Sequence, residues 1–128
     1  MAACLSLLSL LWSVRRLRYG VVRVKVVGWS MEPTLAPGSE VIARRVPPHS
    51  LSNGDIVVLL APDSGQLIIK RIAAIGGTPN PAAEGAAGDV PDGMVVLLGD
   101  NLDKSHDSRH FGCVPANQIM GRVIRQLR

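Results

Sequence analysis

Residues 66–75, Q-L-I-I-K-R-I-A-A-I, are an apolar run that one pair of cations interrupts. We predict a β-strand here, because the run is short and rich in isoleucine. The P-D-S-G sequence at 62–65 predicts a turn that joins this strand to a second apolar run, D-I-V-V-L-L-A at 55–61. The two strands are therefore expected to form a hairpin.

Further short strands are expected on both sides of this hairpin. V-V-R-V-K-V-V (21–27) alternates apolar and cationic residues, which is typical of a half-buried strand. Gly, Pro and Ala residues without periodicity indicate a loop at 76–93. The remaining predictions are strands at 40–46, 94–98 and 119–127 and one short helical turn within 114–119. Many short strands separated by turn signals indicate an all-β sheet or barrel-like domain.

The composition limits both the core and the partners. A chain of 128 residues is one domain in size, and with only 3% aromatic residues its core must consist of Val, Ile, Leu and Ala. The net charge of +4 favours an anionic membrane surface. We expect no nucleic-acid partner, because the cations are scattered and no set of stacking aromatics accompanies them. The two cysteines, Cys4 and Cys113, form neither a metal motif nor a disulfide framework.

The N-terminus is an apolar segment (2–14) followed by arginines at positions 15, 16 and 18. A helix of this length reaches about 20 Å, whereas the hydrocarbon core of a bilayer is roughly 30 Å thick. A short membrane anchor, an interfacial helix, a span that starts before Met1 and a helix packed on the core are all open interpretations.

Lys70 is a candidate general base. Alternate residues share one face of a strand, so Lys70 projects between Ile68 and Ile72. Apolar surroundings disfavour the ammonium form and lower the pKa of a lysine from its usual value of about 10.4. The alternative is a lysine at a strand edge whose stem is buried and whose ammonium stays in water.

Ser30 is a candidate nucleophile in G-W-S-M-E-P-T-L (28–35), where a strand ends and Pro33 constrains the turn. A neutral lysine can take the proton of a serine hydroxyl, a known variant of the catalytic triad. The alternative is a turn serine that hydrogen-bonds to its own backbone.

The segment L-G-D-N-L-D-K-S-H-D-S-R-H-F-G (98–112) is too polar for a strand. It is not a calcium-binding loop, since Leu102 and Lys104 occupy ligand positions, and no metal is implied. A Ser-His-Asp triad through His106 or His110 is open in principle, but no nucleophile elbow accompanies it. These two histidines and His49 are interpreted as surface residues.

Four segments, in order, resemble the type I signal peptidases, which are membrane endopeptidases with a serine–lysine dyad that remove signal peptides. The resemblance is to a small, minimal-core bacterial form. The segments are S-M-E-P-T-L (30–35), G-D-I-V-V-L (54–59), I-K-R-I-A-A-I-G-G (69–77) and G-D-N-L-D-K-S-H-D-S-R-H-F-G (99–112).

The resemblance implies a role for individual residues. Ser30 would be the nucleophile and Lys70 the general base, with Ser105 hydrogen-bonded to the lysine amine and orienting it. The Ser30 N–H would form half of the oxyanion hole. Some members supply the other half from a Ser or Thr hydroxyl two residues before the nucleophile, but this chain has Gly28 there.

The resemblance also implies supporting residues. Two ion pairs, Asp100 with Arg71 and Asp107 with Arg109, would hold the last motif against the strand that carries the base. The substrate groove would be lined by Met31, Ile56 and Val57.

The fold and activity that follow are those of a signal-peptidase-like enzyme. We expect residues 1–20 to be an anchor-like segment with a short apolar helix and a basic flank, and residues 21–128 to be an all-β sheet or barrel serine peptidase domain. The implied function is the removal of signal or leader peptides from precursor proteins at the membrane surface. The implied location is the cell membrane, with the catalytic domain on the extracytoplasmic face, and no cofactor is needed.

Three alternatives stay open at this point. One is a maturation peptidase dedicated to a single partner precursor, which the minimal core and the short anchor favour slightly. Another is a self-cleaving protease of the stress-regulator type, which would need a further domain. The third is a non-catalytic relative that binds signal peptides without cutting them.

Overall fold

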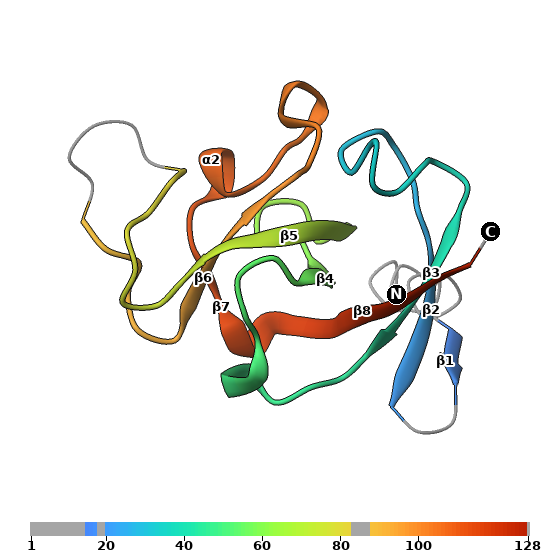
Figure 1. Ribbon diagram of the computed structural model, residues 1–128, viewed down its shortest axis with the longest axis horizontal. Coiled ribbons are helices and arrows are strands. Elements are labelled where there is room, and N and C mark those ends of the chain that lie inside the picture. The colour runs from blue at the N-terminus through green and yellow to red at the C-terminus, as the bar shows by residue number, and fades with distance from the viewer. Residues whose placement is uncertain (1–14, 18–19, 83–87, 128) are drawn as a thin grey trace, which may run out of the picture.

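The computed structural model describes residues 15–17, 20–82 and 88–127, and the predicted helix at 2–14 lies outside them. Within the described residues, eight strands form one antiparallel sheet in the order β1-β2-β3-β8-β4-β5-β6-β7 (Figure 1). The strands are β1 (Arg15–Leu17), β2 (Val21–Lys25), β3 (Glu40–Arg44), β4 (Ile56–Leu60), β5 (Leu67–Ile75), β6 (Met94–Leu98), β7 (Val114–Pro115) and β8 (Ile119–Leu127).

The all-β prediction is confirmed, and so is the hairpin at its centre. Strands β4 and β5 pair antiparallel with Val57 opposite Lys70, so the candidate base lies in the middle of the hairpin. The turn between them contains Gly65 with a φ of 72°, a left-handed conformation that glycine adopts without steric cost.

Strand β8 joins the two halves of the sheet. It pairs with β3 on one side and with β4 on the other, and it runs across the molecule between the two groups of strands (Figure 1). Gly121 allows this close approach, because a Cβ at that position would lie 3.0 Å from the Cβ of Ala43.

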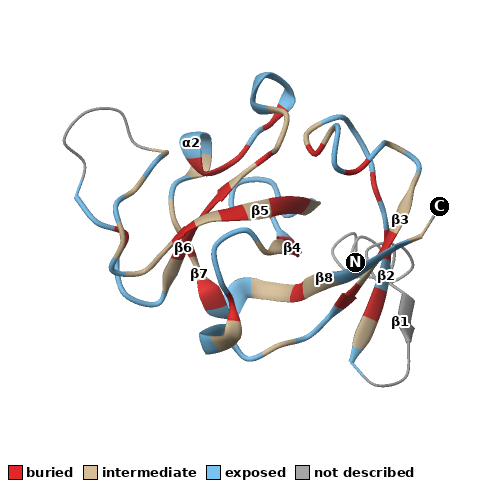
Figure 2. Ribbon diagram, viewed as in Figure 1, coloured by how far each residue is buried: buried red, intermediate tan, exposed pale blue. Residues whose placement is uncertain are grey.

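Figure 2 shows buried residues along most strands of the sheet. Their side chains form three clusters. The first cluster packs β2 and β3 against residues Met31 and Leu35 of the loop that follows β2. The second packs β4, β5 and β6 together. Aliphatic residues fill both, as the composition predicts. The loop that carries Ser30 is therefore attached to the core by its own side chains.

Two elements differ from the sequence prediction. The sheet begins at Arg15 rather than at Val21, because Arg15–Leu17 pairs with β2 as strand β1. A single helical turn, α2 (Ser108–Phe111), was not predicted within the polar segment, and the Asp107 side chain caps it by accepting from Arg109 N. The other helical turns are η1 (Pro48–Ser50), η2 (Leu102–Lys104) and η3 (Ala116–Gln118).

The helices of the described ranges are short, and none has the length and apolar character needed to cross a bilayer. The loop predicted at 76–93 is present in its described parts, with one bridge between Pro79 and Asp89.

Candidate active site

In the nucleophile loop, residues 28–35, Ser30 is preceded by an exposed residue and followed by residues that are buried in the core. Met31 and Leu35 are 1% and 2% exposed, and the Leu35 N–H donates to the Met31 carbonyl at 2.9 Å. Trp29 is 58% exposed on the other side of the serine. Ser30 itself is half-buried, on a loop that the core restrains.

Gly28 leaves no side-chain hydroxyl two residues before Ser30. Its φ is 81°, in the left-handed region that side-chain-bearing residues rarely adopt. A serine or threonine at this position would strain this backbone, although there is open space around the missing Cβ. A second oxyanion donor does not come from this residue.

Lys70 is buried on strand β5, with an exposed fraction of 4%. The interpretation of a lysine whose ammonium stays in water at a strand edge is therefore wrong. Its Nζ donates a hydrogen bond to Ser105 Oγ at 3.1 Å. Burial lowers the pKa of Lys70, the charge of Asp107 opposes that change, and the charge of Arg109 adds to it. The pKa of Lys70 is thus lowered, as its apolar strand predicted.

A chain of hydrogen bonds continues from the lysine into the last motif. Ser105 Oγ donates to Asp107 Oδ2 at 2.7 Å, and Asp107 is 0% exposed. Burial alone would raise the pKa of Asp107, but hydrogen bonds from Arg109, the Gly99 N–H and Ser105 outweigh it and lower the pKa to about 2. Asp107 is therefore ionised at neutral pH and fixes the direction of the Ser105 hydroxyl.

Asp100 connects three parts of the site. It accepts two hydrogen bonds from Arg71, both at 2.8 Å, and a third from Thr34 Oγ1 at 2.5 Å. The hydrogen bond from Arg71 is the main cause of the lowered pKa of Asp100. The nucleophile loop, strand β5 and the last motif are thus linked through one carboxylate, as the expected Asp100–Arg71 pair implies.

The second expected ion pair, between Asp107 and Arg109, is present. Arg109 Nε donates to Asp107 Oδ1 at 2.9 Å, and Arg109 Nη2 donates to the carbonyls of Leu102 at 2.7 Å and Ser105 at 3.2 Å. All of these partners belong to the last motif. The contacts of Arg109 thus lie within the motif, and the connection to β5 runs from Asp107 through Ser105 to Lys70.

Gly99 lies against both Ser105, the hydrogen-bond partner of Lys70, and the backbone of Ser30. A Cβ on Gly99 would lie 2.2 Å from Ser105 Oγ and 2.7 Å from the Ser30 carbonyl oxygen. A side chain at this position would therefore collide with both Ser105 and the Ser30 backbone. Among the described residues, the hydrogen bond of the lysine amine goes to Ser105 and not to Ser30.

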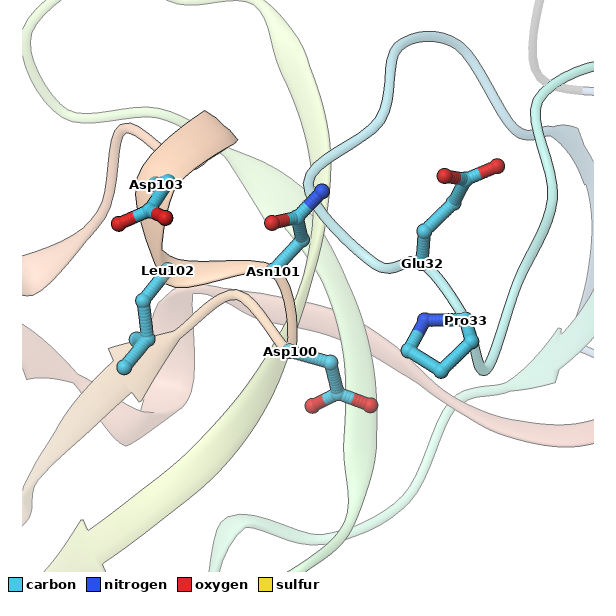
Figure 3. A pocket seen from close by; sticks show the side chains of 6 residues that line it. All are labelled: Glu32, Pro33, Asp100, Asn101, Leu102 and Asp103. Atoms are coloured by element: carbon cyan, nitrogen blue, oxygen red, sulfur yellow. The ribbon is translucent and has the colours of Figure 1, made fainter.

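A cavity of about 500 Å³ opens between the nucleophile loop and the last motif (Figure 3). Three carboxylates lie around it, and neither Ser30 nor Lys70 lines it. The lining residues are Glu32, Pro33, Asp100, Asn101, Leu102 and Asp103.

The three residues predicted to line a substrate groove lie in different environments. Met31 and Val57 are 1% and 0% exposed and pack in the core, whereas Ile56 is half-buried. Strand β4 is paired with β5 and β8, so a peptide cannot pair with it between Val57 and Leu59. Contact of these residues with substrate stays a prediction, and only Ile56 has a partly accessible side chain.

The histidines are exposed, as the sequence predicted. His106 Nε2 lies 2.5 Å from Asp63 Oδ2, and His110 Nδ1 accepts from the Asp107 N–H at 3.2 Å. The triad left open in the sequence is not assembled by these contacts. Across the described ranges, no three His, Cys, Asp or Glu side chains gather as a metal site.

Sequence reasoning did not single out Thr34, Gly99 or Asn101, although all three lie inside the quoted motifs. Asn101 donates to the nucleophile loop twice, from its backbone N–H to the Ser30 carbonyl at 2.8 Å and from its side-chain Nδ2 to the Trp29 carbonyl at 3.1 Å. For Thr34 and Asn101, the available signal was a polar side chain inside a motif to which no role had been assigned.

The comparisons with known proteins agree with one another. The profile of the family described as "Signal peptidase, peptidase S26" matches residues 1–79 and 80–127. The mitochondrial ATP-independent inner membrane protease subunit 1a of Arabidopsis thaliana is 36% identical over 118 residues, which cover 84% of this chain and 70% of that protein. The mitochondrial inner membrane protease subunit 1 of Mus musculus is 36% identical over 106 residues, covering 76% of this chain and 63% of that protein.

A bacterial relative is the protein named "Probable signal peptidase I-1" of Synechocystis sp.. It is 30% identical over 127 residues, covering 74% of this chain and 65% of its own length. This chain thus spans about two thirds of the length of these three relatives, from 63% to 70%.

Proposed function

Because this chain belongs to the signal peptidase family, peptidase S26, we propose that it is a serine endopeptidase with Ser30 as nucleophile and Lys70 as general base. The observation that carries the assignment is the environment of Lys70. Its amine is buried, its pKa is lowered chiefly by that burial, and it is hydrogen-bonded to Ser105 beside the nucleophile loop. A lysine in these surroundings is prepared to act as a neutral base.

The reaction begins when Ser30 Oγ attacks the carbonyl carbon of the scissile peptide bond and its proton passes to Lys70 Nζ. The Ser30 N–H then donates to the oxyanion of the tetrahedral intermediate. The C–N bond breaks, the leaving amine takes the proton from Lys70, and an ester on Ser30 remains. Water, deprotonated by Lys70, attacks this ester, and the collapse of the second intermediate returns the proton to Ser30.

Ser105 and Asp107 hold the base during these steps. The Ser105 hydroxyl donates to Asp107 at 2.7 Å, so its oxygen faces Lys70 as a hydrogen-bond acceptor. This arrangement orients the lysine amine without adding a charge in direct contact with it. The carboxylate of Asp107 remains ionised because its pKa is lowered to about 2.

The proposed substrates are precursor proteins from which a signal or leader peptide is removed at a membrane. Relatives named as inner membrane protease subunits and as a signal peptidase support this substrate class and location. A net charge of +4 suits an anionic membrane surface. Within this class, we assign the chain to the cell membrane with its catalytic domain on the extracytoplasmic face.

The test is cleavage of a peptide that contains an apolar run followed by Ala-X-Ala, with the full chain in detergent. We expect the wild type to cut after the second alanine, and Ser30→Ala and Lys70→Ala to lose the activity. Matched controls are Ser52→Ala and Lys25→Ala, which change an exposed serine and an exposed lysine on other parts of the surface. Both controls should cleave at the wild-type rate.

Three outcomes would change parts of the proposal. Cleavage by Ser30→Ala at the wild-type rate would exclude Ser30 as nucleophile. If the folded wild type binds the peptide as tightly as Ser30→Ala does and never cuts it, the protein is a non-catalytic peptide-binding relative. A folded wild type that cuts only one native precursor would be a dedicated maturation peptidase.

A further inference from the structure

Asn101 holds the peptide groups on both sides of Ser30. Its side-chain Nδ2 donates at 3.1 Å to the carbonyl of Trp29, which belongs to the peptide bond that ends in the Ser30 N–H. Its backbone N–H donates at 2.8 Å to the carbonyl of Ser30 itself. Figure 3 shows the amide nitrogen of Asn101 directed toward the nucleophile loop. One residue of the last motif therefore restrains both peptide planes that flank the candidate nucleophile.

A restrained Trp29 carbonyl also restrains the Ser30 N–H. The peptide unit is planar and trans, so its carbonyl and its N–H point in opposite directions, and fixing one fixes the other. A hydrogen bond accepted by the carbonyl also polarises the peptide and makes its N–H a stronger donor. The Glu32 N–H donates to the same carbonyl at 3.2 Å within the loop, and Asn101 adds the connection from outside the loop.

This restraint matters more here because of Gly28. The position two residues before Ser30 has no side chain in this protein, and its φ of 81° disfavours one. The Ser30 N–H must therefore be well aimed, since oxyanion stabilisation depends on donors that are already in place before the reaction.

Asn101 is itself attached to the rest of the site. The preceding residue, Asp100, accepts from Arg71 and from Thr34, and the Asn101 carbonyl accepts from the Lys104 N–H at 3.0 Å as η2 begins. These contacts connect the position of Asn101 to strand β5, the strand that carries Lys70. The loop that carries Ser30 and the strand that carries Lys70 are thus both hydrogen-bonded to the segment formed by Asp100 and Asn101.

We propose that Asn101 is a positioning residue that fixes the peptide groups flanking Ser30 and aims the Ser30 N–H at the oxyanion. This inference rests on the serine endopeptidase activity proposed above. Asn101 does not contact the reacting atoms in this mechanism. It acts through the Ser30 N–H, which stabilises the oxyanion, so its effect should appear in the rate of the chemical step.

The kinetic test compares Asn101→Ala and Asn101→Asp with the wild type on the Ala-X-Ala peptide. We expect kcat to fall about 10-fold to 100-fold, less than the roughly 10²–10³-fold loss that follows removal of an oxyanion donor. KM should change less than about 3-fold, and the pH midpoint of activity should stay in place because the Lys70–Ser105 contact is unaltered. Asn101→Asp keeps the side-chain size, puts an acceptor against the Trp29 carbonyl, and replaces the alanine variant if that variant does not fold.

The matched control is Leu102→Ala, which truncates the next residue, whose side chain is 49% exposed. Lys104→Gln controls for the charge that Asn101→Asp introduces, since it also makes the segment more negative by one unit. Both controls should keep kcat within about 2-fold of the wild type. A kcat within about 2-fold of the wild type in both Asn101 variants, or a loss confined to KM, would overturn the inference.

Amide hydrogen exchange without substrate separates this inference from the proposed activity. We expect faster exchange at Glu32, and at the backbone amide of residue 101, in Asn101→Ala, and unchanged exchange in Leu102→Ala. Unchanged exchange in Asn101→Ala would overturn the positioning role even in an active enzyme. A wild type that never cleaves would refute the proposed activity, whereas the exchange result would still decide whether Asn101 restrains the loop.

Discussion

Ser105→Ala should separate the catalytic role of a buried serine from its contribution to stability. The substitution removes the acceptor of the hydrogen bond from Lys70 Nζ, which is 3.1 Å from Ser105 Oγ. Asp107 Oδ2 keeps two other donors, the Gly99 N–H at 3.0 Å and an Arg109 nitrogen at 3.1 Å. The main loss is therefore the hydrogen-bond acceptor of the buried Lys70 amine.

The expected magnitudes follow from that count. A buried polar group left without a partner costs about 1–3 kcal/mol, so the melting temperature should fall by several degrees. A base that is misplaced by about 1 Å costs roughly 10²-fold in rate, so kcat should fall by about that factor. KM should change little, since Ser105 Oγ is occupied by Lys70 and Asp107 within the protein.

Ser108→Ala is the matched control for this prediction. Ser108 is buried to a similar degree, 6% exposed against 8% for Ser105, and its Oγ accepts from the Leu97 N–H at 2.8 Å. Its removal leaves one buried donor unpaired, as Ser105→Ala does, but at a place that does not contact Lys70. The two variants should therefore lose similar stability.

The assay measures kcat, KM and the unfolding free energy of both variants at a temperature at which both are folded. Only Ser105→Ala should lose the roughly 10²-fold in kcat. Equal losses of kcat in the two variants would refute the reasoning, because the effect would then come from general loosening of the fold. A wild-type kcat in Ser105→Ala would show that Lys70 needs no orientation by this hydroxyl.

Three further predictions concern the same site. Gly99→Ala should lower kcat by at least about 10²-fold, whereas Gly76→Ala, whose Cβ would meet the Pro91 carbonyl oxygen at 2.8 Å, should cost only about 1–3 kcal/mol of stability in thermal melts. Plotted against pH, log kcat/KM should rise with unit slope and level off below the ordinary lysine pKa of 10.5, because burial lowers the pKa of Lys70. A flat profile down to about pH 5 would contradict this. Asp107, whose pKa falls from 3.8 to about 2 on folding, should contribute about 2 kcal/mol of stability above pH 3.8, and this contribution should be lost as the pH drops toward 2. Acid unfolding curves that depend equally on pH in the wild type and in Asp107→Asn would disprove this prediction.

Much of the fold and the two central residues could be predicted from local sequence. The strand periods and turn residues act over a few neighbours, so they predicted the β4–β5 hairpin and the all-β class without knowledge of distant contacts. Lys70 was recognisable for the same reason, since apolar residues flank it on its own strand, β5. Strand β1 was not predicted, because it depends on pairing with β2 rather than on its own pattern.

The supporting contacts were decided by tertiary structure. Asp107 and Arg109 pair inside their own motif because a single helical turn, capped by Asp107, brings them together, and the sequence order alone did not indicate that turn. Met31 and Val57 are in the core because the loop and the sheet close over them.

The sequence by itself determined which side chains are available for chemistry, through short-range patterns around Ser30 and Lys70. Only the tertiary structure decided how they are held, through Gly99 between the two motifs and Asn101 against both peptides of the nucleophile. The physical reason is that hydrogen bonds are short and directional. Whether residues far apart in the chain form them depends on the path of every loop between them.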